Sequence, residues 1–442
     1  MKRENTARGE GFLALFLPVL ISGLFGQLYP IVSTALISHR LDITALSAVG
    51  ALAPYSVLQS ALFAGLGTGV ALEVSLDLNR KGAVRKAGVS SGALLIACLT
   101  LAAGALLAAV AKPLCTLMGI REALLDDCTT YLKVLLLGSG FITLKTAALQ
   151  TCQNTGQTRF ASVVSMAGVV LQSGISITLF FLFPGEIWYV PMSTLLTNIA
   201  VSLCLLARIR RKAPDLRGSL KIGESQSGAL NSAGKMAKLG FSRSGLMLLI
   251  GVGGFFLQRS VNGLSTEVIS GYSGGNVAVN LFMEPLNAIA VLATIHATKE
   301  GMTDNVRRLL QVERGLMGRA AVYCLALLLV LPFAGRPLLR FLLGEGADSP
   351  AVLAGYLRLA VTVPLFLPLA VYLSGRNILQ LLRPGVLVVL GACEFLCEMA
   401  GAVLVPRVGY PAAPACIAAA WVIGAVLCLV FLRIEWKKVP SC

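Results

Sequence analysis

The chain has 442 residues, of which 56% are hydrophobic and only 13% are charged. A soluble chain of this length carries about 25% charged residues, because its surface must be hydrated. The composition therefore excludes a soluble multidomain protein, a disordered chain and a disulfide scaffold, and it indicates an integral membrane protein. The net charge of +16 has to be explained by where the basic residues lie.

Twelve apolar stretches are long enough to cross a bilayer as helices, since a hydrocarbon core of roughly 30 Å needs about 20 apolar residues. They lack the strict alternation of barrel strands, so the predicted fold class is an all-α integral membrane protein with twelve transmembrane helices. The predicted spans are 11–38, 46–75, 88–111, 129–150, 160–183, 187–207, 237–261, 267–297, 315–335, 351–373, 384–404 and 411–433.

Most of the 37 Lys and Arg residues fall in segments on the same side as the N-terminus. Basic residues in short loops favour the cytoplasm, so we expect a multi-pass protein of the cytoplasmic membrane with both termini in the cytoplasm. Its environment is then membrane lipid. Basic loops beside a bilayer do not make a nucleic-acid groove, so no nucleic acid is expected as a partner.

The sequence contains no motif for a metal site or for catalysis. Most of the eleven cysteines fall in or near apolar spans, where Cys acts as a small hydrophobe, and there are only two histidines. CxxC, Walker A and HExxH patterns are absent. The two GxSxG matches, at 88–92 and 271–275, lie within predicted membrane spans and lack the strand–turn–helix setting of a catalytic serine. We therefore expect no metal, no cofactor and no enzymatic activity. A channel is also disfavoured, because no filter ring or voltage sensor is present.

The second half of the chain repeats the first half at an offset of about 224 residues. Lys112-Pro113-Leu114 matches Arg336-Pro337-Leu338, and Tyr131-Leu132-Lys133 matches Tyr356-Leu357-Arg358. Gly185 likewise matches Gly409. A nearly constant offset along the whole chain indicates a tandem duplication.

Each repeat holds six predicted spans, an even number, so both repeats enter the membrane from the same side. We therefore predict two parallel six-helix lobes that rock around a central cavity, as in secondary transporters. The N-lobe is predicted at 1–207 and the C-lobe at 236–442, with a cytoplasmic linker at 208–235 that is polar, basic and rich in Gly and Ser.

Stretches along nearly the whole chain resemble the multidrug and toxic compound extrusion (MATE) family, nearest its bacterial damage-inducible branch. They are residues 16–50, 61–87, 149–168, 260–275 and 375–421. The family consists of twelve-helix, two-lobed antiporters that export organic, often cationic compounds in exchange for protons or sodium. The resemblance implies the same fold (MATE/MOP flippase-like), a small organic substrate, and H⁺ or Na⁺ as the coupling ion.

The sequence departs from this family where coupling is concerned. Many members carry an Asp four residues after a Tyr late in the first helix, whereas this chain has Tyr29 followed by Ser33. In the eleventh helix, related sequences often pair a Glu with an Arg four residues later, and this chain has Glu394 and Glu398. The resemblance therefore implies the export role but does not identify the coupling residue.

Four charged residues within the spans are the candidates for cation coupling, because an ionisable group at membrane depth costs about 2.5–3.5 kcal/mol on insertion scales. Glu284 precedes Pro285, which frees a backbone carbonyl one turn back as a further oxygen ligand. Glu394 and Glu398 lie one turn apart and disfavour joint ionisation, which suits a proton carrier. Arg259 is the nearest predicted basic residue. The alternative is that Arg259 only neutralises Glu284 or Glu394.

Polar and Met side chains near the predicted cavity are the candidates for substrate binding. They are Ser33, Tyr29, Lys145, Gln150, Asn154, Asn198, Asn262 and Met283. Lys145 either pairs with Glu73 or contacts an anionic substrate.

The function predicted from the sequence is a secondary antiporter that exports amphipathic, often cationic compounds by alternating access. We expect it to be a monomer. The alternative is a flippase of the same superfamily for a lipid or a lipid-linked saccharide, and a membrane scaffold is a non-transport alternative. A scaffold predicts that neutral substitutions at Glu284 and Glu398 are tolerated.

Overall fold

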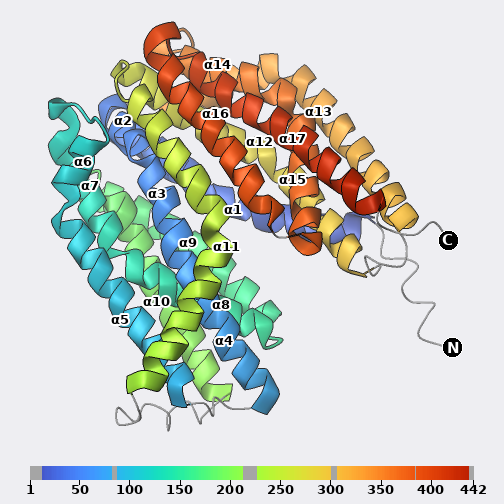
Figure 1. Cartoon of the computed structure of the whole chain (residues 1–442). Helices are drawn as coiled ribbons and strands as arrows, with labels where there is room; N and C mark the ends of the chain where they lie inside the picture. The colour runs from blue at the N-terminus through green and yellow to red at the C-terminus, as the bar shows by residue number, and fades with distance from the viewer. Residues whose placement is uncertain (1–11, 82–86, 213–225, 300–305, 384, 438–442) are drawn as a thin grey trace. The chain divides into compact units, whose positions relative to one another are not determined.

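The computed structural model describes residues 12–81, 87–212, 226–299, 306–383 and 385–437, and within these ranges every regular element is helical (Figure 1). The elements are α1 (Phe12–Arg40), α2 (Ile43–Ala51), α3 (Ala53–Gln59), η1 (Ser60–Ala64), α4 (Gly65–Lys81), α5 (Ala87–Ala109), α6 (Ala111–Leu117), α7 (Glu122–Leu137), α8 (Ser139–Asn154), α9 (Thr158–Leu182), α10 (Tyr189–Lys212), α11 (Gln226–Val261), α12 (Thr266–Lys299), α13 (Val306–Leu343), α14 (Pro350–Thr362), η3 (Val363–Leu365), α15 (Phe366–Leu382), α16 (Val386–Val408) and α17 (Ala412–Lys437).

Twelve helical stretches in the described part of the chain are long and apolar enough to cross a membrane. Each of them overlaps one of the twelve predicted spans, so the prediction of an all-α multi-pass membrane protein is confirmed. The boundaries differ mainly in the fourth, ninth and tenth spans, which run over 122–154, 313–343 and 350–380. These spans are longer than predicted because they continue into segments that carry charged residues.

Two of the spans contain a break at equivalent positions of the sequence repeat. Gly138 separates α7 from α8, and the 3₁₀ turn Val363–Leu365 separates α14 from α15. Pro364 explains the second break, because it has no backbone N–H to continue the helix. Gly119 and Gly344 also correspond in the repeat, and both adopt positive φ, at 70° and 66°. These shared features agree with the predicted duplication.

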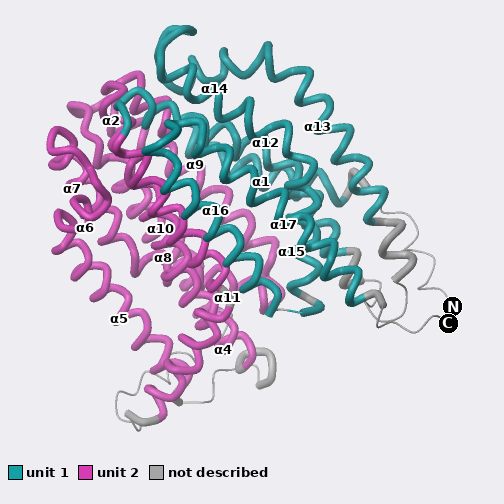
Figure 2. Tube along the Cα trace, turned by 45° about the horizontal axis from the view of Figure 1, so that its top comes forward, with its two compact units in different colours: residues 1–31, 264–442 teal, residues 32–263 magenta. Residues whose placement is uncertain are grey.

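The chain forms two compact units (Figure 2). Unit 1 comprises residues 1–31 and 264–442, and unit 2 comprises residues 32–263. Unit 1 thus combines the first part of α1 with α12–α17, whereas α11 belongs to unit 2. These boundaries differ from those of the predicted lobes, which stay a prediction about the repeat. Part of the predicted linker, residues 213–225, lies outside the described residues.

Small residues explain why α11 joins unit 2. A Cβ atom on Gly69 of α4 would collide with the backbone of Met236 and Gly240 of α11, so the two backbones approach closely. A Cβ on Gly92 of α5 would likewise lie only 2.9 Å from the Cβ of Ser232 of α11. Such close approach maximises van der Waals contact where lipid provides no hydrophobic driving force between helices. Met236 lies fully buried in this interface.

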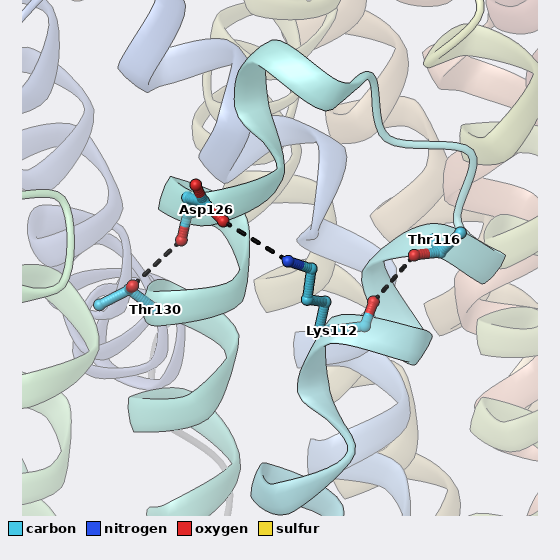
Figure 3. Close-up of polar contacts among 4 residues, drawn as sticks. All are labelled: Lys112, Thr116, Asp126 and Thr130. Atoms are coloured by element: carbon cyan, nitrogen blue, oxygen red, sulfur yellow. Dashed lines mark hydrogen bonds and ion pairs between the residues drawn. The ribbon is translucent and has the colours of Figure 1, made fainter.

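An exposed ion pair links α6 to α7 at one end of unit 2 (Figure 3). Lys112 Nζ lies 3.9 Å from Asp126 Oδ1, and these side chains are 62% and 96% exposed. The nearby hydroxyl groups of Thr116 and Thr130 donate to carbonyl oxygens of their own helices, at 3.1 Å and 3.0 Å. In unit 1, Arg336, the repeat counterpart of Lys112, lies 3.8 Å from Asp348.

Candidate functional site

Glu284 lies in α12 of unit 1 and is held against the first part of α1. The Gln27 side-chain amide donates a hydrogen bond of 2.7 Å to Glu284 Oε1. The Glu284 carboxylate occupies the place that a Cβ atom on Gly23 would take, so a glycine at this position of α1 makes room for it. Both Gln27 and Glu284 are only partly buried. The carboxylate is therefore positioned by a neutral amide and keeps its negative charge uncompensated by that partner.

Pro285 does not break α12, which continues from Thr266 to Lys299. The lack of an N–H at Pro285 does release the carbonyl of Leu281, one turn back. The next carbonyl, Phe282 O, accepts a hydrogen bond of 2.7 Å from the Tyr323 hydroxyl of α13. α12 is therefore continuous at Pro285, and the role of the freed carbonyl as an oxygen ligand beside Glu284 stays a prediction.

A cavity of about 550 Å³ adjoins Pro285, between α1, α12 and α13 of unit 1. Its lining is mostly apolar and small, with one cation and one phenol. The lining residues are Phe16, Pro285, Ile289, Gly315, Gly318, Arg319, Val322, Tyr323 and Ala326. A cavity of this volume accommodates a small organic molecule, since ligand pockets measure roughly 300–1,000 Å³.

The two carboxylates of α16 interact with basic residues of their own unit. Glu394 interacts electrostatically with Tyr372 and Arg376 of α15. Glu398, one turn further along, interacts with Glu394 and with Arg358 of α14. These acids therefore have cationic neighbours, whereas the hydrogen-bond partner of Glu284 is a neutral amide.

Arg358 is the buried cation of this group, with only 5% of the residue exposed. Its guanidinium carbon lies 4.2 Å from the centre of the Tyr272 ring. Its Nε and Nη1 atoms have no hydrogen-bond partner, and neither has the buried Oε2 of Glu398. A buried charge of this kind is stabilised by the opposite charge and by the ring face.

Tyr410, in the connection between α16 and α17, completes the surroundings of Arg358. Its ring packs edge-on against Tyr272, with centroids 6.1 Å apart, and its hydroxyl donates to Ala354 O at 3.0 Å. Burial raises the pKa of Tyr410 above its ordinary value, so this group donates as a neutral phenol.

Sequence reasoning missed Tyr372 and Arg376 and did not assign a role to Arg358. Arg376 falls just beyond the predicted span 351–373, but it lies within the span 350–380, and its guanidinium carbon is 5.5 Å from the centre of the Tyr372 ring. The available signal was the four-residue spacing of Tyr372 and Arg376, which matches that of Glu394 and Glu398. Arg259, the predicted basic partner, belongs to unit 2, where it is exposed beside Gly119.

Three of the predicted cavity residues of unit 2 join α8 to its neighbours. Gln150 donates to Thr68 Oγ1 of α4 at 3.0 Å, and Asn154 donates to Ser75 Oγ at 3.3 Å. Lys145 donates instead to Asn198 Oδ1 of α10, at 2.8 Å. The structure therefore gives Lys145 a neutral partner, whereas the sequence left open pairing with Glu73 or contact with an anionic substrate.

Asn262 has a structural environment. It is 2% exposed, and its amide donates to Met118 O at 3.2 Å and to Ala51 O at 3.4 Å. Its own oxygen accepts from Gln258 at 2.9 Å. These bonds satisfy carbonyl groups at the ends of α2 and α6, which have no partners within their helices.

The remaining candidates lie in two different units. Tyr29 and Met283 are partly buried residues of unit 1, and Met283 directly precedes Glu284. Ser33, the residue where relatives carry an acid, is 8% exposed and belongs to unit 2.

Comparison with known proteins identifies the fold. Residues 18–178 match the family model described as MatE. The inward-facing structure of a multidrug resistance MATE family transporter of the MOP superfamily superposes with a TM-score of 0.70 and 14% identity, covering 96% of this chain and 98% of that chain. An outward-facing structure of such a transporter gives a TM-score of 0.65 and 17% identity, covering 96% and 95%.

A MOP superfamily transporter from Pyrococcus furiosus, whose binding pocket of reverse polarity is said to suggest a different function, gives a TM-score of 0.68 and 18% identity. The superposition covers 97% of this chain and 96% of that one. No curated protein matches the sequence. The whole chain thus has the fold of these transporters.

Proposed function

We propose that this protein, which carries a MatE domain within a MATE-type fold, is a secondary antiporter that exports amphipathic organic compounds. Alternating access is supported by the likeness to both inward-facing and outward-facing transporters. The basic segments next to the spans support a position in the cytoplasmic membrane with both termini in the cytoplasm.

The observation that carries the proposal is the Glu284–Gln27 hydrogen bond beside a cavity. A carboxylate at membrane depth needs a compensating charge, and its amide partner supplies none. A proton or a sodium ion supplies it from solution. We therefore assign coupling to Glu284 ahead of Glu394 and Glu398, whose neighbours Arg376 and Arg358 already carry positive charge.

The adjacent cavity supplies the link between ion and substrate. Pro285 follows the carboxylate directly, and it lines the cavity together with Tyr323 and Arg319. Neutralising Glu284 changes the field and the α1–α12 hydrogen bond next to this space, so occupation by an ion and occupation by a substrate affect each other. Such differential interaction is what a coupled exchange requires.

The test is dye flux in proteoliposomes under an imposed pH gradient and, separately, a sodium gradient. We expect the wild-type protein to drive dye against its concentration under one of the two. Glu284→Gln should abolish the gradient-dependent component but retain dye binding, because the amide cannot exchange a cation and keeps the shape of the site. Glu186→Gln, at an exposed carboxylate outside the spans, is the matched control and should transport at the wild-type rate.

Two outcomes would contradict the proposal at different levels. Gradient-driven flux at the wild-type rate in Glu284→Gln would remove Glu284 from coupling while leaving the transporter intact. Absence of flux under both gradients, in a wild-type sample that is folded and correctly inserted, would refute the antiporter itself.

A further inference from the structure

Unit 2 contains a line of polar side chains across three neighbouring helices, formed by Gln172 of α9, Thr194 and Asn198 of α10, and Lys145 of α8; we call it the polar seam. The three helices pack on one another (Figure 1). The Gln172 amide donates to Thr194 Oγ1 at 2.7 Å, and Lys145 Nζ donates to Asn198 Oδ1 at 2.8 Å. Because Thr194 and Asn198 are four residues apart, they lie on one face of α10.

The polar seam lies at membrane depth. Lys145 is nine residues from the end of α8 at Asn154, which places its Cα roughly 13 Å from that helix end. The hydrocarbon core is about 30 Å thick, so the ammonium group sits far from either aqueous phase. Lysine is an expensive residue at this position, and an uncompensated charge there is a functional candidate.

The seam carries one positive charge, and its other side chains are neutral. The partner of the ammonium is an amide oxygen, and the neighbouring groups are a second amide and a hydroxyl. Asn198 is 3% exposed, whereas Lys145, Gln172 and Thr194 are partly accessible. The seam therefore offers donors and a cation to a ligand while lacking a negative group of its own.

We infer that the polar seam binds the acidic group of an organic anion or zwitterion, with the Lys145 ammonium as its counter-ion. The inference rests on the proposed transport function, because it names the class of substrate that unit 2 selects. Asn198 positions the ammonium. Gln172 lies next along the face to orient the bound carboxylate, sulfonate or phosphate ester, and it is held by Thr194, whose own hydroxyl donates to Val190 O at 3.2 Å. A purely structural contact between α8 and α10 needs no charge, because two amides join helices as well at lower cost.

A matched pair of dyes tests this by binding alone. Rhodamine 110 has a free carboxyl group, and rhodamine 123 is its methyl ester, so the two differ only in the acidic group. Fluorescence anisotropy titrations with the full-length protein in detergent give a dissociation constant for each. We expect the free acid to bind about tenfold more tightly than the ester, the size of one charge-assisted hydrogen bond.

Four variants connect the preference to the seam. Lys145→Gln should remove it, and Lys145→Arg should retain it. Asn198→Asp keeps the lysine but gives it an internal carboxylate, so this variant should lose the preference as well. Lys133→Gln, at an exposed lysine of α7, is the charge-matched control and should behave like the wild type.

The outcomes separate the inference from the proposed function. Equal or tighter binding of the ester by the wild type, no binding of either dye, or a preference that survives both Lys145→Gln and Asn198→Asp would overturn the inference. Acid-selective binding without flux under any gradient would refute the antiporter and leave the anion site standing.

Discussion

Each of the two units holds a charged group on a neutral amide, but the charges are opposite. In unit 1 the Gln27 amide donates to Glu284 at 2.7 Å, and in unit 2 the Asn198 oxygen accepts from Lys145 at 2.8 Å. In both cases the amide fixes the position of the charge without cancelling it. The difference teaches that polarity is divided between the units: unit 1 offers a site to a cation, and unit 2 offers one to an anion.

A second pair of residues occupies equivalent positions of the repeat but differs in burial. Lys133 and Arg358 correspond in the duplication, yet Lys133 is exposed on α7 while Arg358 is 5% exposed inside unit 1. The buried member has the Tyr272 ring and Glu398 as neighbours. Unit 1 therefore contains charges of both signs that stabilise one another, in addition to the amide-bound Glu284.

The largest effect on stability is expected from breaking that internal balance. Arg358→Gln should lower the free energy of unfolding by about 3 kcal/mol, because it leaves Glu398 without its cation and removes the contact with the Tyr272 ring. Lys133→Gln, at the equivalent position, should change it by less than about 0.5 kcal/mol, as exposed positions do. Thermal and denaturant unfolding in detergent measures both.

The double variant Arg358→Met with Glu398→Met sharpens this prediction. Removing both charges leaves no uncompensated group, so the double variant should be more stable than Arg358→Gln. If it is less stable, the two residues act independently and the electrostatic balance of unit 1 is not what holds Arg358 inside.

Unit 2 should be more sensitive to packing than to charge. Gly69→Ala should lower the free energy of unfolding by about 2 kcal/mol, because its methyl group collides with the backbone of Met236 and Gly240. Gly234→Ala, on the exposed side of α11 with nothing near its Cβ, should instead stabilise the helix by about 0.5–1 kcal/mol. Changes of opposite sign in the free energy of unfolding would show that the effect of Gly69→Ala comes from close packing and not from replacing glycine in general. Changes of the same sign would contradict the packing explanation.

The sequence allowed the fold to be predicted well, because composition and hydropathy determine where helices cross a bilayer. The four polar residues of the seam were harder. Lys145 and Asn198 were recognisable as candidates, but their hydrogen bond depends on the rotation of two helices, which no local pattern encodes. The predicted span 351–373 ends before Arg376, because the apolar run stops there, whereas the observed span 350–380 continues past it.

The grouping of helices into the two compact units cannot be read from the sequence. The predicted lobes describe the repeat, whereas α11 joins unit 2 through close backbone contacts at Gly69 and Gly92. Glycines are frequent throughout the spans, so their number does not show which of them face another backbone. The position of Gly23 beside the Glu284 carboxylate is a further example.

The negative charge of Glu284 can be compensated by a basic side chain placed in unit 1 itself. Gln27→Lys places an ammonium beside Glu284, which favours the ionised carboxylate and competes with a proton or sodium ion. Gradient-driven flux should fall by about tenfold, corresponding to roughly 1.4 kcal/mol of competition. In Gln27→Met, which removes the hydrogen bond without adding charge, the flux should fall less. A rate for Gln27→Lys equal to that of Gln27→Met would show that positioning, and not charge, is what Gln27 contributes.

The smallest effects are expected at the surface ion pairs of Lys112 and of its repeat counterpart Arg336. Lys112→Gln should cost at most about 0.3 kcal/mol, because Lys112 and Asp126 are 3.9 Å apart and largely exposed. Arg336 pairs with Asp348 but also lies 5.2 Å from the Tyr356 ring centre, so Arg336→Gln should cost about 1 kcal/mol. High salt should abolish the first cost and only part of the second, because screening weakens exposed ion pairs more than contact with a ring. Equal costs for the two variants would mean that the aromatic neighbour adds nothing, and that these repeat positions, unlike Lys133 and Arg358, have not diverged in energy.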